Sequence, residues 1–168
     1  MFQSNTKSFL QFISLILLQV FLLNNVNLFG FLNPYIYLLF LITYRFDNNP
    51  TLLILIGFVM GFLLDLLSQG AGGHMIASLA IAFLRPYIIQ FSFGVNSDIS
   101  MGMVRGTSLP NRLLYLVLMV FIHHLILFIV VYFNLKSISI IFKYTFFTTI
   151  FSFILLWISL GFFKTRHD

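Results

Sequence analysis

The chain contains no cysteine and no glutamate, and it carries few charges of either sign. The absence of cysteine excludes disulfide bonds and thiolate metal sites. The carboxylate side chains are those of Asp47, Asp65, Asp98 and Asp168. Charged residues make up 8% of the 168 residues, whereas soluble domains carry about 25%. So few charges cannot cover a water-facing surface, and the composition therefore indicates a protein whose solvent is lipid.

Apolar residues are abundant instead: they make up 60% of the chain, and 23 of them are phenylalanine. The basic residues behind the net charge of +5 are scattered singly near the ends of apolar runs. That pattern sets the orientation of membrane proteins and does not indicate nucleic-acid binding. Lys7 and the apolar run after it resemble a signal peptide, but asparagines follow where a small-x-small cleavage site would lie. We interpret this run as an uncleaved first membrane helix.

Six apolar runs approach the roughly 20 residues that a membrane-spanning helix needs. They cover about 9–23, 28–44, 51–67, 75–93, 113–133 and 138–163. We therefore predict an all-α integral membrane protein, a single polytopic domain over residues 1–168 with about six transmembrane helices. Five helices are the alternative, because the first three runs are short. Asn33-Pro34 near the start of the second run predicts a bend or a later beginning of that helix.

The distribution of lysine and arginine predicts the orientation. With six spans, both termini lie on one side of the membrane, together with the second and fourth loops. That side collects seven basic residues: Lys7, Arg45, Arg85, Arg105, Arg112, Lys164 and Arg166. The other side has only Lys136 and Lys143. Because the positive side is cytoplasmic, we predict that both termini are cytoplasmic.

Three small or polar residues share one face of the third run, because Gly57, Gly61 and Asp65 are spaced four apart. Glycines at this spacing allow a second helix to approach closely. The approaching helix can belong to this chain or to a partner, and both interpretations stay open. A carboxylate at the position of Asp65 is costly in a membrane unless it is paired or hydrated. It can accept hydrogen bonds from the backbone of residues 69–74, pair with His74, or contact a ligand or partner.

The fourth run begins after a glycine-rich turn, Ser68–His74, which includes Gly73. This turn is not a phosphate loop, because it lacks the Gly-Lys-Ser/Thr ending and follows a membrane helix. Further along, Pro86 predicts a kink or an end of the helix. Arg85 can anchor the orientation, extend toward the interface, or bind carbonyls freed by the kink. Pairing of Arg85 with Asp65 is not expected, because they lie about 10 Å or more apart along the membrane normal.

Two adjacent histidines, His123 and His124, fall in the middle of the fifth run. Neighbours on a helix differ by about 100° in direction, so one faces the interior and the other a seam. We predict packed, hydrogen-bonded imidazoles in place of a metal site, because His74 and His167 lie at opposite membrane sides. The chain lacks H-E-x-x-H, G-x-S-x-G and a pair of membrane aspartates. The prediction is therefore no catalysis, no cofactor and no metal.

The order of these motifs resembles one known family. The motifs are Asn33-Pro34-Tyr35-Ile36-Tyr37, Gly57-x-x-x-Gly61-x-x-x-Asp65, Ser68, Gly73-His74-x-x-Ala77, Arg85-Pro86 and Ile122-His123-His124. Over roughly Asn33–Phe128, and in chain length, the sequence resembles the rod shape-determining protein MreD family. The candidates for an interface or structural role, with no catalytic role, are Gly57, Gly61, Asp65, Gly73, His74, Arg85, Pro86 and His123. The match to Gly94–Arg112 and to the sixth run is poor.

The resemblance implies a bacterial inner-membrane scaffold of the cell-wall elongation complex, which maintains cell shape. The implied partners are MreC, the actin-like MreB, the glycosyltransferase RodA and a class B penicillin-binding protein. The family is also similar in fold to the six-helix substrate-binding components of energy-coupling-factor vitamin transporters. A substrate-binding subunit of a small-molecule transporter is therefore the alternative function. It would need a polar pocket near Asp65 and His74.

Overall fold

The computed structural model describes residues 5–30, 32–44, 50–94 and 107–164, and these residues form helices and no strand. The helices in chain order are α1 (Asn5–Phe21), α2 (Leu38–Thr43), α3 (Pro50–Leu67), α4 (Gly73–Phe93), α5 (Leu109–Tyr132) and α6 (Ile138–Lys164). Short 3-10 turns, η1 (Leu23–Asn25) and η2 (Leu135–Ser137), follow α1 and precede α6. Arg45, Arg105 and Arg166, which enter the orientation argument, lie outside the described residues.

Five of the described helices, α1, α3, α4, α5 and α6, are long and apolar enough to cross a membrane. The chain is therefore an all-helical, multi-pass membrane protein. The prediction of a sixth spanning helix over 28–44 is wrong, because this run forms only the six-residue α2. At 1.5 Å per residue, α2 is about 9 Å long, far less than the thickness of the hydrocarbon core.

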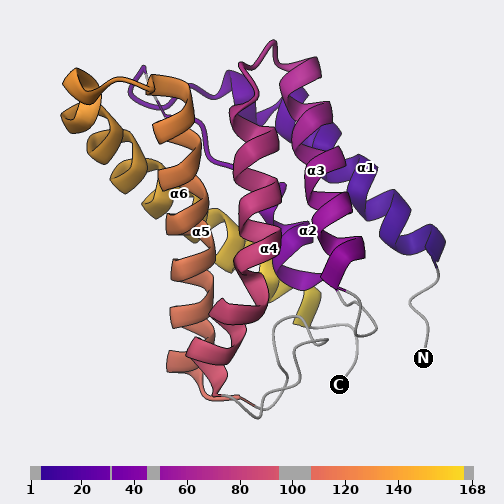
Figure 1. Ribbon diagram of the computed structural model, residues 1–168. Coiled ribbons are helices and arrows are strands. Elements are labelled where there is room, and N and C mark those ends of the chain that lie inside the picture. The colour runs from indigo at the N-terminus through magenta and orange to yellow at the C-terminus, as the bar shows by residue number, and fades with distance from the viewer. Residues whose placement is uncertain (1–4, 31, 45–49, 95–106, 165–168) are drawn as a thin grey trace.

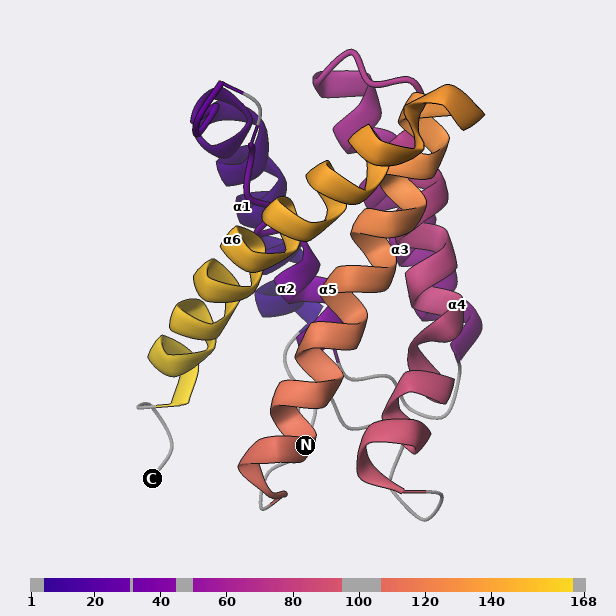
Figure 2. The ribbon, with the colours of Figure 1, turned by 90° about the vertical axis from the view of Figure 1, so that its left-hand side faces the viewer.

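The second run nevertheless leads from the end of the bundle where α1 ends to the level at which α3 begins (Figure 1). It begins in a turn where Leu28 and Leu32 exchange backbone hydrogen bonds and Gly30 has φ +80°. Asn33-Pro34 then keeps the backbone extended, because proline has no N–H and disfavours helix at the residue before it. We refer to residues 33–43 as the broken crossing. The broken crossing adds a further passage to the five long helices, and the beginning of α1 and the end of α6 therefore lie at the same end of the bundle (Figure 2).

The broken crossing lies in the centre of the bundle. Helices α3, α4 and α5 stand side by side, and α1 and α6 lie across from them, with α2 in between (Figure 2). Every residue from Leu38 to Ile42 is buried. Non-helical backbone at membrane depth is tolerated where protein surrounds it, and this burial meets that condition. The outward faces carry large apolar side chains, such as Phe91 and Leu66, which suit contact with lipid.

Helices α3 and α4 pack through the glycine face of α3. A Cβ atom built on Gly57 would lie 2.8 Å from the carbonyl oxygen of Ser78. A Cβ atom built on Gly61 would collide with the carbonyl oxygen of His74 and lie 2.5 Å from Cα of Met75. The absence of side chains therefore allows the two backbones to touch. This face packs within the chain, so it is not open to the helix of a partner.

Candidate functional site

The extended part of the broken crossing is held by side chains from two other helices. Gln19 of α1 is fully buried, accepts a hydrogen bond from the Ile36 amide (2.8 Å) and donates to the Pro34 carbonyl (3.2 Å). Ser152 of α6 accepts a hydrogen bond from the Tyr35 amide at 2.9 Å. These groups replace the partners that a helix would provide, which a backbone away from water requires.

The end of α2 is held in the same way from α4 and α5. The Ile42 carbonyl accepts hydrogen bonds from Arg85 Nη2 (3.1 Å) and from the Tyr115 hydroxyl (3.2 Å). Arg85 Nε also donates to the Tyr115 oxygen at 2.9 Å. Arg85 is fully buried, so it acts inside the bundle and not as an anchor at its surface. The Ile42 carbonyl that Arg85 binds belongs to α2.

Pro86 does not end its helix, because α4 continues through it to Phe93. Of the two outcomes predicted for this residue, termination is therefore wrong. Proline inside a helix removes one backbone hydrogen bond. The contacts of α4 with α5 and α2 at Arg85, the residue before it, hold this part of the helix in place.

A cluster of histidine and tyrosine rings lies where the broken crossing meets α4 and α5. The Tyr37 hydroxyl is 3.0 Å from Nδ1 of His74 and 2.7 Å from Nε2 of His123. Tyr37 and His123 are fully buried, whereas His74 is partly exposed at the beginning of α4. The sequence places these three residues in three separate runs, and the fold joins them through one hydroxyl group.

His124 extends this cluster toward α6. Its Nδ1 is 3.4 Å from the Thr149 hydroxyl and its Nε2 is 3.4 Å from the Ser152 hydroxyl. The Tyr35 ring lies 5.3 Å from the His124 ring and 5.2 Å from the His74 ring, centre to centre. Both histidines of α5 are fully buried. His123 faces Tyr37 of the broken crossing, and His124 faces α6. Among the described residues, no group of three or more metal-ligating side chains could hold a metal ion.

Asp65 holds the turn between α3 and α4. Its Oδ2 accepts a hydrogen bond from the Met75 amide (2.8 Å) and its Oδ1 accepts one from the His74 amide (3.3 Å). The Gly70 amide donates to the backbone carbonyl of Asp65 at 2.7 Å. A carboxylate at the N-terminus of a helix satisfies free amides and opposes the positive end of the helix dipole. Of the roles considered for Asp65, the structure shows that of a hydrogen-bond acceptor for the backbone of the turn.

Gly73 brings the same turn close to α5. A Cβ atom built on it would lie 2.9 Å from Cγ2 of Val131 and 3.0 Å from Cδ1 of Leu127. On the opposite flank, Asn24 after α1 donates to the Ser68 hydroxyl at 2.7 Å. The turn therefore contacts both α5 and the segment after α1, and it closes this end of the bundle.

Substitution of Asp65 should separate its hydrogen bonds from its charge. Asp65→Asn keeps one acceptor oxygen, and we expect it to lower stability by about 1 kcal/mol. Asp65→Leu removes both acceptors and should cost about 2 kcal/mol or more, since the part-buried amides of His74 and Met75 lose their partner. Thermal unfolding of both variants in the same detergent measures the difference. Equal losses in the two variants would show that the charge, and not the hydrogen bonds, holds the turn.

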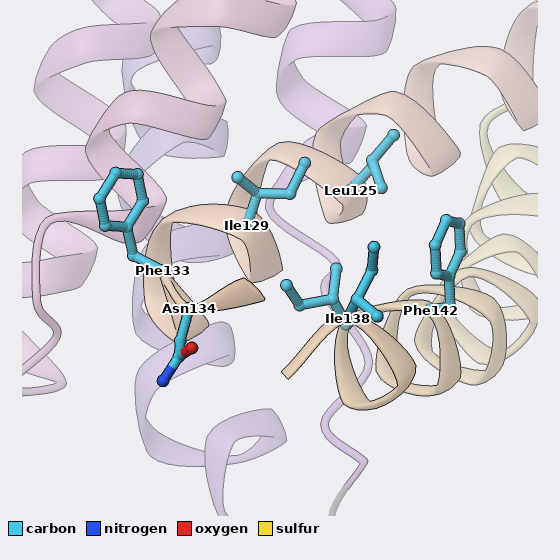
Figure 3. Close-up of a pocket in the computed structure, with 7 residues that line it drawn as sticks. Leu125, Ile129, Phe133, Asn134, Ile138 and Phe142 are labelled. Carbon is cyan, nitrogen blue, oxygen red and sulfur yellow. The ribbon is translucent and has the colours of Figure 1, made fainter. Parts of the chain in front are cut away.

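An apolar pocket of about 320 Å³ opens between the end of α5 and the beginning of α6 (Figure 3). It is lined by Leu125, Ile129, Phe133, Asn134, Ile138, Ile141 and Phe142. This lining is unlike the polar pocket near Asp65 and His74 that a vitamin-binding subunit would need. Asn134, its one polar residue, uses its side-chain oxygen to accept a hydrogen bond from the Lys136 amide at 2.9 Å.

Several residues that hold the site were not singled out from the sequence: Gln19, Tyr115, Thr149 and Ser152. Single polar residues in apolar runs are the signal that could have found Gln19 and Ser152, since such residues usually face a bundle interior. Tyrosine carries no comparable signal, because it is also common at membrane interfaces.

The fold and these contacts define a class: a multi-pass helical membrane protein whose second crossing is discontinuous and held by polar side chains. Comparison of the chain with protein-family models, curated proteins and solved structures finds no match.

Proposed function

We propose that the chain is a non-catalytic scaffold of the bacterial cell-wall elongation complex, in the inner membrane, with both termini cytoplasmic. The observation that supports this proposal best is the filled interior. The broken crossing occupies the centre of the bundle, and its exposed fraction is 0% at Tyr37, Leu38, Leu41 and Ile42. The polar groups described above contact one another inside the bundle. A protein of this kind offers its outer surface to partners, as a scaffold does.

The proposed partners follow the resemblance to the MreD family. They are MreC, bound through its transmembrane helix, and through it MreB, RodA and a class B penicillin-binding protein. Because the glycine face of α3 packs on α4, a partner helix has to bind elsewhere on the lipid-facing surface. Association there rests on close packing and on hydrogen bonds worth about 1 kcal/mol or less each.

One observation favours the second candidate, a substrate-binding subunit of a small-molecule transporter. Discontinuous membrane segments often form the substrate sites of transporters. The broken crossing, with its tyrosine and histidine cluster, is such a segment. In this structure its side chains are packed against α4, α5 and α6, so a substrate could enter only if the crossing moved.

Affinity purification of the tagged protein from mild detergent should separate the two candidates. We expect mass spectrometry to recover a bitopic MreC-like protein and the wall synthases, enriched over a tagged, unrelated multi-pass protein of similar size. Native mass spectrometry of the same sample should show no retained small molecule. Recovery of a pair of ATPases together with a bound small molecule would refute the scaffold and support the transporter subunit.

A further inference from the structure

The hydrogen bonds around Tyr37 have a preferred direction. A neutral imidazole carries one N–H, and the Nδ1 atom of His123 is buried with no hydrogen-bond partner among the described residues. A hydrogen on that Nδ1 would be a buried donor without an acceptor, which is unfavourable. The hydrogen of His123 therefore belongs on Nε2, where it donates to the Tyr37 oxygen. Tyr37 in turn donates to Nδ1 of His74.

His74 is the end of this row of hydrogen bonds that protons from outside the bundle can reach. It is partly exposed at the beginning of α4, whereas Tyr37 and His123 are fully buried. Burial within the bundle works against a positive charge on the imidazole of His74, and the nearby carboxylate of Asp65, which binds the His74 amide, works in its favour.

The other groups around the cluster are consistent with a proton binding at His74. The remaining titratable side chains that face it are Tyr35 of the broken crossing, His124 of α5 and Tyr132 at the end of α5. Helices α6 and α1 contribute Ser152, Thr149 and Gln19, and α4 contributes the Ser78 hydroxyl beside Tyr37; none of these groups titrates. Asp65 is therefore the carboxylate that acts on His74.

The row of hydrogen-bonded groups from His74 to His123 ends in the middle of the bundle. About one helical turn below His123, Met119 and Val120 are fully buried and apolar. Tyr115, which belongs to the Arg85 contacts, lies about 12 Å from His123 along α5. A proton that enters at His74 thus finds no continuous polar path across the described bundle, so the arrangement suits sensing and not conduction.

We propose that His74 is a proton-binding site and that Tyr37 and His123 transmit its occupancy to the broken crossing. A proton on Nδ1 of His74 removes the acceptor of the Tyr37 hydroxyl. Two N–H groups then point at the Tyr37 oxygen, and its own O–H group has to turn from His74 to the neighbouring Ser78 hydroxyl. The hydrogen bonds that tie the crossing to α4 and α5 are rearranged, and the crossing becomes easier to open at acidic pH. This inference does not depend on the proposed function.

Hydrogen–deuterium exchange of the full-length protein in nanodiscs tests the inference. Protection factors of residues 35–42, corrected for the intrinsic exchange rate, should fall about tenfold relative to the middle of α5 between pH 7.5 and pH 4.5. His74→Gln should remove this pH dependence. An equal fall in His74→Gln, or no fall in the wild type, would overturn the proposal.

Two tyrosine substitutions keep the test decisive if His74→Gln does not fold. Tyr37→Phe keeps the ring and both imidazoles but removes the bridging hydroxyl, so protection should be low at both pH values. Tyr35→Phe removes a neighbouring hydroxyl that is not part of the bridge and should keep the wild-type response. A full pH response in Tyr37→Phe would show that the bridge does not sense protons.

Discussion

Gly61→Leu is expected to abolish the folded protein. The side chain would have to occupy the space of the His74 carbonyl and the Met75 Cα of α4. Backbone atoms cannot move aside as the end of a flexible side chain can, so α3 and α4 would have to separate. Overpacking usually costs 1–3 kcal/mol, and we expect a loss of about 3 kcal/mol or more here. Size-exclusion chromatography and thermal unfolding in one detergent measure it.

The chain offers a matched control in Gly161→Leu. A Cβ atom built on Gly161 meets nothing within 4 Å, and this glycine also lies in a membrane-spanning helix, α6. Leucine there should leave the elution profile and the unfolding temperature close to those of the wild type. Similar losses in both variants would mean that leucine harms these helices in general, and the α3–α4 contact would not be the cause.

Gln19→Leu is expected to have the second largest effect. Leucine is similar in size and more apolar, so composition alone would predict a neutral or stabilising change in a membrane. The substitution however removes the partners of the Ile36 amide and the Pro34 carbonyl. Two backbone groups without partners, each costing about 1–3 kcal/mol, predict a loss of about 2–6 kcal/mol. Thermal unfolding measures this loss, and hydrogen exchange should show that residues 35–42 open first.

Gln11→Leu is the matched control for this substitution. Gln11 lies two turns earlier in α1 and is only partly buried, and its contact to Ser14 uses the backbone carbonyl. Leucine at this position should be neutral within about 0.5 kcal/mol. If Gln19→Leu were as stable as Gln11→Leu, the broken crossing would be held by apolar packing and not by the amide.

Both predictions concern the same property of the molecule. Four helices each provide a side chain that replaces the missing hydrogen bonds of the broken crossing: Gln19 of α1, Arg85 of α4, Tyr115 of α5 and Ser152 of α6. The fold of the crossing therefore depends on the assembled bundle, since an isolated segment in lipid would leave these groups without partners.

Hydropathy and spacing predicted much of this protein without a structure. The runs over 51–67 and 75–93 correspond to α3 and α4, because an apolar stretch of this length has no soluble alternative. The spacing of Gly57, Gly61 and Asp65 predicted one shared face, because a helix repeats every 3.6 residues. Whether that face served the chain or a partner was left open, because small residues allow close approach without specifying which helix approaches.

The second run shows what the sequence could not decide. Its hydropathy is that of a spanning helix, and Asn33-Pro34 indicated only a bend or a later beginning of the helix, which in the structure begins at Leu38. Whether such a segment bends or stays extended depends on partners for its backbone, and these come from residues as distant as Ser152. The same is true of Tyr37, His74 and His123, which are brought together only when three segments pack. Composition and periodicity thus determined that the protein lies in a membrane and where its long helices run. Long-range hydrogen bonds, which leave no local pattern in the sequence, determined the broken crossing and its cluster.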